Sequence, residues 1–276
     1  MSPDRVTNGV AADPAHDEVA SADGRPSSGA VVMATRGLSK RYGPFRAVSD
    51  VDLDIHEHDV HVFIGPNGAG KSTVLNMLGG QILPSAGEVY FDGRPLGRST
   101  PSWRARAGIG RSFQLTSIIP GFTCLENVLL AVQARRGLFA LLRLSSRADD
   151  VEHAHELLDL VGLDAAADVP AELLAHGQQR QLEIAAALAG PPRVLLLDEP
   201  SSGTSAHERA DLAELLRRIV KTATVVMAEH DVHLVRTVAT RVTAFSEGKK
   251  IAEGSATEVF DDGEVRRVFL RGRRDA

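Results

Sequence analysis

A glycine-rich segment with the sequence GPNGAGKST, residues 65–73, carries the side chains best suited to chemistry in this chain. An apolar run at 60–64 precedes it and a helical stretch follows it. Strand, glycine-rich turn and helix form the context of a phosphate-binding loop, where backbone N–H groups and a helix N-terminus face phosphate oxygens. A bare glycine-rich turn is the alternative, and the flanking pattern disfavours it. The residues predicted to bind the phosphates and their Mg²⁺ are Gly65, Asn67, Gly68, Gly70, Lys71, Ser72 and Thr73.

Two acidic residues, Asp198 and Glu199, follow the apolar run 194–197. The carboxyl end of a parallel strand is the edge of a sheet where ligands bind. We expect Asp198 to hold Mg²⁺ through water and Glu199 to polarise an attacking water as a general base. The alternative is an acidic turn with no chemical role.

A histidine, His230, follows another predicted strand, 224–228. At the same sheet edge it could donate a hydrogen bond to a γ-phosphate, although a single histidine at a strand end is more often structural. The next residue, Asp231, is predicted to be the N-cap of a helix.

Composition indicates a globular protein with enough residues for one large or two small domains. The formal net charge is −5, and residues 1–30, with five acidic side chains and two arginines, account for −3 of it. Residues 31–276 are therefore near neutral, which gives no support to nucleic-acid binding. The single cysteine, Cys124, excludes an internal disulfide and is expected to pack in the core. No apolar run approaches the length of a membrane span and no signal pattern opens the chain, so we expect a cytosolic protein, one that can still attach to a membrane partner.

Hydrophobic periodicity predicts an α/β core interrupted by helices. Strands are expected at 31–34, 51–55, 60–64, 88–91, 194–197, 224–228 and 242–245. The predicted divisions are a disordered tail at 1–30, a core at 31–114 and 186–262, a helical subdomain at 115–185, and a C-terminal helix with a basic end at 263–276. Tyr42 precedes Gly43, and from these residues alone a buried strand end is the preferred interpretation.

The order of motifs resembles the ATPase subunits of ABC transporters over about residues 34–271. These motifs are the glycine-rich loop, Gln114, Gly177–Arg180, Leu197–Pro200 and His230. The resemblance implies an α/β P-loop NTPase, with an ABC-type ATPase core of mixed sheet and an inserted α-helical subdomain. It also implies ATP and Mg²⁺ as cofactors.

The same resemblance assigns roles to individual residues. Tyr42 would stack on adenine, and Gln114 would couple Mg²⁺ and water to a membrane partner. The catalytic set would be Glu199, His230, Gln114 and Lys71, and the metal set Ser72, Gln114 and Asp198. The segment Leu174–Gln178 matches the family's signature motif, in which Ala175, Gly177 and Gln178 would contact the γ-phosphate bound to an opposing subunit.

Finer features resemble the ATPases of branched-chain amino acid importers, a pattern shared with importers of urea and short amides. They are the segments 108–114, 137–139, 177–185, 229–231, 254–259 and 265–270. Expected partners are membrane permease subunits, a second ATPase subunit in a homo- or heterodimer, and indirectly a solute-binding protein, with no nucleic acid. The expected location is the cytoplasmic face of the cell membrane. Apolar residues at 118–122 are predicted to receive a permease helix, with internal packing as an equal alternative.

Three positions depart from the family pattern. Ala175 replaces the usual signature serine, and His176 stands where the subfamily tends to have an aromatic residue. The loop 201–205 reads SSGTS, where families normally have leucine and then aspartate or asparagine. A lost oriented hydrogen bond there would cost about 1–3 kcal/mol, or roughly ten- to hundredfold in rate.

Several other functions fit parts of the pattern. An ABC ATPase acting on ribosomes or DNA usually carries two cassettes or a long coiled coil, which this chain lacks. An exporter ATPase, such as one serving lipopolysaccharide, fits the glutamine-rich signature less well. A degenerate subunit that binds ATP but scarcely hydrolyses it is disfavoured because Glu199 and His230 are both present.

Overall fold

The computed structural model describes residues 29–111, 118–134 and 148–272, with side chains described as far as Phe269. The expected tail therefore lies outside the described residues apart from Gly29 and Ala30, and so do Gln114 and the segment 137–139. Within the described residues, no helix is both long and apolar enough to span a bilayer.

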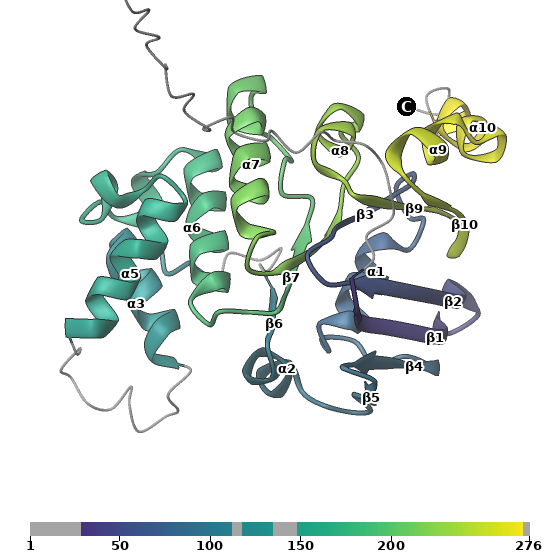
Figure 1. Ribbon diagram of the computed structural model, residues 1–276, viewed down its shortest axis with the longest axis horizontal. Coiled ribbons are helices and arrows are strands. Elements are labelled where there is room, and N and C mark those ends of the chain that lie inside the picture. The colour runs from purple at the N-terminus through teal and green to yellow at the C-terminus, as the bar shows by residue number, and fades with distance from the viewer. Residues whose placement is uncertain (1–28, 112–117, 135–147, 273–276) are drawn as a thin grey trace, which may run out of the picture.

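A six-stranded mixed sheet forms the centre of the molecule (Figure 1). All neighbouring strands in it are parallel except the β9–β10 hairpin, which is antiparallel. Its strands, in spatial order, are β10 (Lys249–Gly254), β9 (Arg241–Ser246), β3 (Val60–Ile64), β8 (Thr224–Ala228), β7 (Val194–Asp198) and β6 (Ile109–Arg111). Every residue of β3, β7 and β8 is buried, which explains why these strands are almost continuously apolar.

A second, four-stranded antiparallel sheet packs beside the first. Its order is β2 (Phe45–His56), β1 (Val31–Tyr42), β4 (Ala86–Phe91) and β5 (Arg94–Pro95). One hydrophobic cluster fills the space between the inner face of this sheet, one face of the central sheet and helix α1 (Lys71–Leu78). Strand β1 is much longer than the predicted 31–34 because it pairs with both β2 and β4.

Helices cover the opposite face of the central sheet and extend to one side of it (Figure 1). A group of three helices that contact one another lies at that side: α3 (Cys124–Ala134), α5 (Ala148–Leu160) and α6 (His176–Leu188). Two short 3₁₀ turns, η1 (Asp164–Ala166) and η2 (Ala171–Leu173), connect α5 to α6. The other helices within the described residues are α2 (Pro101–Ala107), α7 (Ala206–Ile219), α8 (Val232–Val238), α9 (Ala256–Asp261) and α10 (Gly263–Gly272).

Local capping signals set several helix starts. Thr123 and Glu126 exchange backbone-to-side-chain hydrogen bonds before α3, and Ser205 and Glu208 do the same before α7. Asp231 is the N-cap of α8, because its carboxylate accepts from the Leu234 N–H. The prediction that Cys124 packs in the core is confirmed, since its side chain is fully buried.

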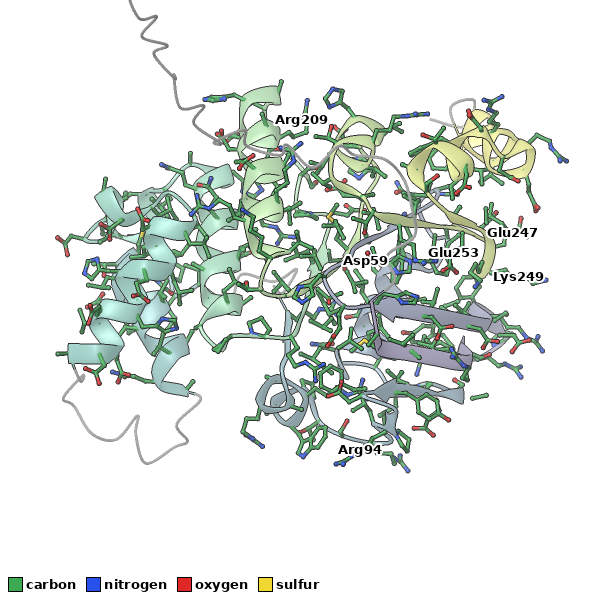
Figure 2. The ribbon with its side chains drawn as sticks, in the orientation of Figure 1. Asp59, Arg94, Arg209, Glu247, Lys249 and Glu253 are labelled. Carbon is green, nitrogen blue, oxygen red and sulfur yellow. The ribbon has the colours of Figure 1, made fainter. Side chains whose placement is uncertain are left out.

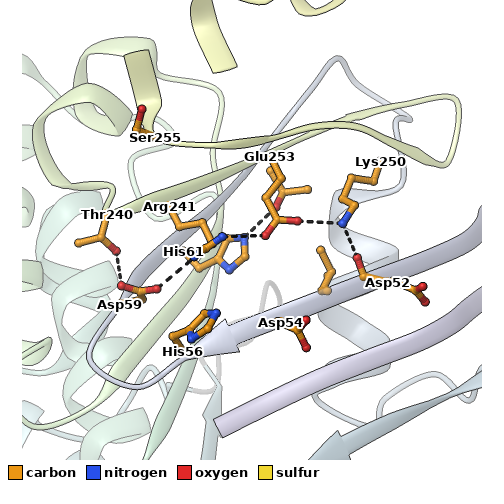
Figure 3. Close-up of polar contacts among 12 residues, drawn as sticks. Asp52, Asp54, His56, Asp59, His61, Thr240, Arg241, Lys250, Glu253 and Ser255 are labelled. Carbon is orange, nitrogen blue, oxygen red and sulfur yellow. Dashed lines mark hydrogen bonds and ion pairs between the residues drawn. The ribbon is translucent and has the colours of Figure 1, made fainter. Parts of the chain in front are cut away.

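A chain of ionic contacts fastens the β9–β10 hairpin to the start of β3 (Figure 3). Arg241 lies 3.1 Å from Glu253 and 3.8 Å from Asp59. Lys250 contacts the same Glu253 at 2.8 Å, and Thr240 donates to Asp59 at 2.8 Å. These contacts hold the far end of the sheet, away from the strand ends that carry the candidate site.

A buried histidine, His61, lies beside this cluster in the middle of β3. Its Nε2 is 2.7 Å from the Thr243 hydroxyl, and its ring meets Phe63 edge to face. Burial, assisted by the positive charge of Arg241, lowers the pKa of His61 from 6.5 to about 3. The imidazole is therefore neutral at physiological pH.

Candidate functional site

The loop between β3 and α1 adopts a backbone that only glycine accommodates easily at its two ends. Gly65 has φ 145°, and a Cβ there would lie 2.3 Å from the Phe245 carbonyl oxygen. Gly70 has φ 102°, and a Cβ there would lie 2.6 Å from the Ala47 carbonyl oxygen. Gly70 is also the N-cap of α1 and has no side chain to accept from the first N–H groups of the helix. Those donors suit an anion such as a phosphate.

Lys71 lies almost fully buried at the inner side of this loop. Its ammonium donates to the carbonyl oxygens of Gly65 at 2.7 Å and Pro66 at 3.1 Å. Burial lowers the pKa of Lys71, while the carboxylates of Glu199 and Asp198 act in the opposite direction. A buried ammonium between a glycine loop and two carboxylates is placed to neutralise a phosphate.

Asp198 ends β7 directly opposite the start of α1. Its Oδ1 accepts a hydrogen bond of 3.0 Å from the Ser72 hydroxyl. Its Oδ2 is buried with no hydrogen-bond partner among the described residues, and the Arg111 guanidinium is 3.7 Å away. Burial raises the pKa of Asp198, and the Ser72 bond and the Arg111 charge oppose that rise. An unsatisfied carboxylate oxygen beside a hydroxyl matches the oxygen ligands of Mg²⁺, so these two residues fit the predicted metal role.

Glu199 occupies an unusual backbone position immediately after Asp198. Its φ is 48°, in the left-handed region that costs a non-glycine residue about 1–2 kcal/mol. Its Oε1 lies 3.9 Å from His230 Nδ1, which is too long for a direct hydrogen bond but leaves the two groups facing one space. Strain retained at such a place is typical of functional turns.

Register explains why these groups meet. Asp198 on β7 and Phe63 on β3 both lie opposite Ala228 on β8, so the three strands end at one level. The structure thus brings together the glycine loop, Lys71, Ser72, Asp198, Glu199 and His230 at one edge of the central sheet. Gln114 lies outside the described residues, and its role stays a prediction.

Tyr42 is 48% exposed at the end of β1, so the expectation of a buried strand end is wrong. Tyr42 pairs with Phe45 at the tip of the β1–β2 hairpin, beyond the part of the sheet that covers the core. Lys40 places its ammonium 5.2 Å from the centre of the Tyr42 ring. An exposed ring of this kind has room for a flat heterocycle.

The segment 174–178 leads into helix α6, with Leu174 buried and Ala175, His176 and Gln178 exposed beside α7. The Ala175 N–H donates to Gln178 Oε1 at 3.1 Å, and Ala175 has no side-chain oxygen to cap the helix. A Cβ at Gly177 would lie 2.1 Å from Glu208 Oε1, so α6 and α7 begin against each other. His176 lies next to Gly203 in the loop before α7.

Several side chains around the site were not predicted from the sequence. Arg180 on α6 donates to the Asp198 carbonyl and pairs with Glu183 at 2.5 Å. Arg111 pairs with the Asp198 carboxylate from β6. Glu229 is fully buried beside His230. Charged residues at strand ends were the available signal, but their partners depend on contacts between distant segments.

Comparison with known proteins gives a consistent result. A family model described as ABC transporter matches residues 48–202. The chain is 35% identical over 250 residues to the high-affinity branched-chain amino acid transport ATP-binding protein BraF of Pseudomonas aeruginosa, covering 87% of this chain and 97% of that protein. It is 33% identical over 248 residues to LivG of Escherichia coli K12, a protein of the same description, with the same coverage. It is also 30% identical over 240 residues to the lipopolysaccharide export system ATP-binding protein LptB of Haemophilus influenzae, covering 87% of this chain and 97% of that protein.

Solved structures show the same fold. The ADP conformation of MJ1267, an ATP-binding cassette of an ABC transporter, superposes with a TM-score of 0.79 at 27% identity, covering 87% of this chain and 98% of that one. The dimeric post-hydrolysis state of the cassette MJ0796, bound to ADP and phosphate, gives a TM-score of 0.71 at 28% identity, covering 81% and 98%.

Proposed function

Since the chain belongs to the ABC transporter family of ATP-binding proteins, we propose that it is the ATP-hydrolysing subunit of an importer for branched-chain amino acids or related small polar solutes. It is a nucleotide-binding ATPase that works in a transporter. The main support for the importer assignment is the likeness to BraF, which extends over 97% of that protein. Branched-chain amino acids are the solutes named for both BraF and LivG.

The geometry supports a specific division of roles in hydrolysis. Lys71 and the N–H groups at the start of α1 bind the phosphates, and Asn67, Gly68 and Thr73 complete the loop. Ser72 and Asp198 would hold Mg²⁺, which would neutralise charge on the phosphates when bound. The metal role of Gln114, which lies outside the described residues, stays a prediction. Glu199 orients the attacking water as a general base, and His230 donates to the γ-phosphate. Tyr42 stacks on the adenine ring.

A second ATPase subunit completes the site. At the start of α6, Ala175 and Gln178 are exposed and Gly177 is partly exposed, and all three lie outside this chain's own phosphate loop. The backbone N–H groups of Gly177 and Gln178, in the first turn of α6, suit the γ-phosphate held by an opposing subunit. The dimeric form of the related cassette MJ0796 supports this arrangement, and either a homodimer or a heterodimer satisfies it.

An apolar patch on the helical side provides the surface for a permease. We define this patch as Ile119, Phe122 and Leu173, whose exposures are 37%, 40% and 72%. Asn127 holds the loop beneath it by bonding the backbone of Ile119, Phe122 and Thr123. Ile118, by contrast, is buried in the helical core, so internal packing is its role. Binding a permease here would place the protein on the cytoplasmic face of the membrane, with a solute-binding protein as an indirect partner and no nucleic acid involved.

The test of hydrolysis is Glu199→Gln, which keeps the side-chain size and removes the base. The wild-type chain should hydrolyse Mg-ATP, and the variant should lose hydrolysis and accumulate an ATP-bound dimer in size-exclusion chromatography. A wild type that binds ATP but does not hydrolyse it would support the alternative of a degenerate subunit, for which the departures at Ala175, Thr204 and Ser205 are the motivation.

The solute is tested in vesicles that hold this chain with its permease and binding protein. Leucine uptake that requires ATP and fails with Glu199→Gln supports the proposal. Uptake of urea instead of leucine would redirect it to the amide importers. Outward movement of lipopolysaccharide would favour an exporter, the function named for the relative LptB.

A further inference from the structure

We propose that Glu229 and Arg209 are positioning residues that lock the loop 201–205 to the turn carrying His230. The loop connects Glu199 to helix α7, and its sequence departs from the family pattern. This inference rests on the proposed function, because it assigns these two residues a part in the same hydrolysis.

Glu229 bridges two segments with one buried carboxylate. Its side chain is 0% exposed between the end of β8 and the start of α8. Oε1 accepts from the Ser201 N–H at 2.9 Å, on the loop. Oε2 accepts from the N–H groups of His230 at 2.8 Å and Asp231 at 3.2 Å, on the turn. Each oxygen therefore serves a different segment, and the position of Ser201 fixes that of His230.

Arg209, whose position on α7 is labelled in Figure 2, forms a second bridge between the same two segments. From α7 its Nη1 donates to the Thr204 carbonyl at 2.7 Å, and its Nε lies 3.1 Å from Asp231 Oδ2. The other oxygen of Asp231 caps α8 by accepting from the Leu234 N–H. The guanidinium is about one-third exposed, so solvent screens this pair only in part. The planar Arg209 guanidinium donates to a carbonyl and to a carboxylate at the same time, and a lysine ammonium does not reproduce this geometry.

The loop itself is short and internally bonded, which makes it suited to transmit a displacement. The Thr204 hydroxyl donates to the Ser201 carbonyl at 2.7 Å, and the Ser202 N–H donates to the Glu199 carbonyl at 3.1 Å. Glu199 in turn donates its N–H to the Ala228 carbonyl on β8. Movement of the loop against an opposing subunit would therefore reach both Glu199 and His230.

Four variants separate the two bridges. Glu229→Gln keeps the shape but leaves an amide facing N–H donors on one side, so one of the two segments loses its acceptor. Asp231→Asn keeps an N-cap side chain for α8 and removes the charge that pairs with Arg209. Arg209→Ala removes both contacts of the fork, and Arg209→Lys should restore activity only in part.

The expected result is a fall in kcat of about tenfold for each of the first three variants, with KM for ATP within about twofold of the wild type. Arg209→Ala combined with Asp231→Asn should be no worse than Arg209→Ala alone, because both substitutions break the Arg209–Asp231 ion pair. Amide hydrogen exchange at 201–205 and 229–231 should be faster in Arg209→Ala. Arg217→Ala is the matched control: Arg217 also links α7 to α8, through the Thr237 carbonyl at 3.4 Å, and touches neither segment.

Unchanged kcat and unchanged exchange in the variants would overturn the inference, as would equal effects in Arg217→Ala. Failure of the proposed function looks different, because the wild type itself would then show no ATP hydrolysis. In that case, the rate of amide hydrogen exchange at 201–205 and 229–231 still shows whether Glu229 and Arg209 hold the two segments together.

Discussion

The Ser72 hydroxyl donates a hydrogen bond of 3.0 Å to Oδ1 of Asp198, joining residues that stand 126 positions apart in the chain. Ser72 lies on the first turn of α1 and Asp198 ends β7. The contact therefore ties the phosphate loop to the strand that supplies Glu199. Because Asp198 Oδ2 is buried without a hydrogen-bond partner among the described residues, the pair holds an oxygen that a cation can use.

Asp198→Asn is expected to abolish the contribution of Mg²⁺ to ATP affinity. Asparagine keeps an oxygen for the Ser72 hydroxyl and removes the buried charge, so the fold should survive. ATP titrations by calorimetry, with and without Mg²⁺, should show a large difference for the wild type and almost none for the variant. Ser72→Ala keeps the carboxylate of Asp198, so the effect of Mg²⁺ on its ATP affinity should lie between those of the wild type and Asp198→Asn. A variant that binds ATP more tightly when Mg²⁺ is added would contradict the role given to Asp198.

Glu199→Gly should be more stable than Glu199→Ala by about 1 kcal/mol, because glycine adopts the left-handed backbone without a Cβ clash. Both variants lack the carboxylate and should be inactive. Urea unfolding of the two proteins measures the difference. Equal stabilities would show that the backbone at 199 relaxes once the carboxylate is gone.

Tyr42→Ala should weaken Mg-ATP binding by about two- to tenfold, since an aromatic stack contributes about 0.5–1.5 kcal/mol. Tyr42→Phe keeps the ring and should bind as the wild type does. The half-exposed ring adds little to stability, so thermal unfolding should barely change. Trp103→Ala, at another half-exposed aromatic residue, is the control and should leave affinity unaltered. If Tyr42→Ala also has no effect, the adenine lies elsewhere.

Replacing both Ile119 and Phe122 with alanine should reduce co-purification with the permease while the isolated chain keeps its ATPase activity. The two side chains are exposed, so their loss should cost the fold little. Pull-down from detergent extracts gives the measurement, and Leu173→Ala should add to the loss. Val232→Ala, at an exposed apolar residue on α8, serves as the comparison. Full retention of the permease would place its docking surface away from this patch.

Stability should fall as pH decreases below 6.5, because His61 has a pKa of about 3 in the native state against 6.5 as its ordinary value. Between these values the unfolded chain binds a proton that the folded chain excludes. The free energy of unfolding therefore falls by about 1.4 kcal/mol for each pH unit below 6.5. Above the pKa of His61 in the unfolded chain, this loss is absent. Urea unfolding of the wild type and His61→Gln across this range should show the slope only in the wild type. His207→Gln, at a histidine whose side chain is 88% exposed, should keep the slope.

The sequence predicted the parts of the site that depend on local chain order. The glycine loop lies between a continuous apolar strand and a helix, and the pair Asp198 and Glu199 directly follows another such strand. Those patterns also predicted a mixed α/β fold with a helical block. Once the strands are parallel, their carboxyl ends must share an edge, so the meeting of Lys71 with Asp198 follows from topology.

The remaining features depend on pairing between distant segments. Tyr42 was expected to be buried, but the β1–β2 hairpin extends past the core and exposes its tip. The bridges made by Glu229 and Arg209 require the loop after β7 to lie beside the turn after β8, which no local pattern encodes. Arg111 meets Asp198 for the same reason, through the pairing of β6 with β7.

The close approach of Gly65 to the Phe245 carbonyl has a consequence for biosynthesis. Strand β9 also pairs with β3, and the Gly248 N–H bonds the Ala69 carbonyl inside the glycine loop. A nascent chain that has not yet released β9 from the ribosome therefore lacks one wall of its own nucleotide loop. ATP capture should begin only late in translation, and a fluorescent nucleotide could time the completion of the core.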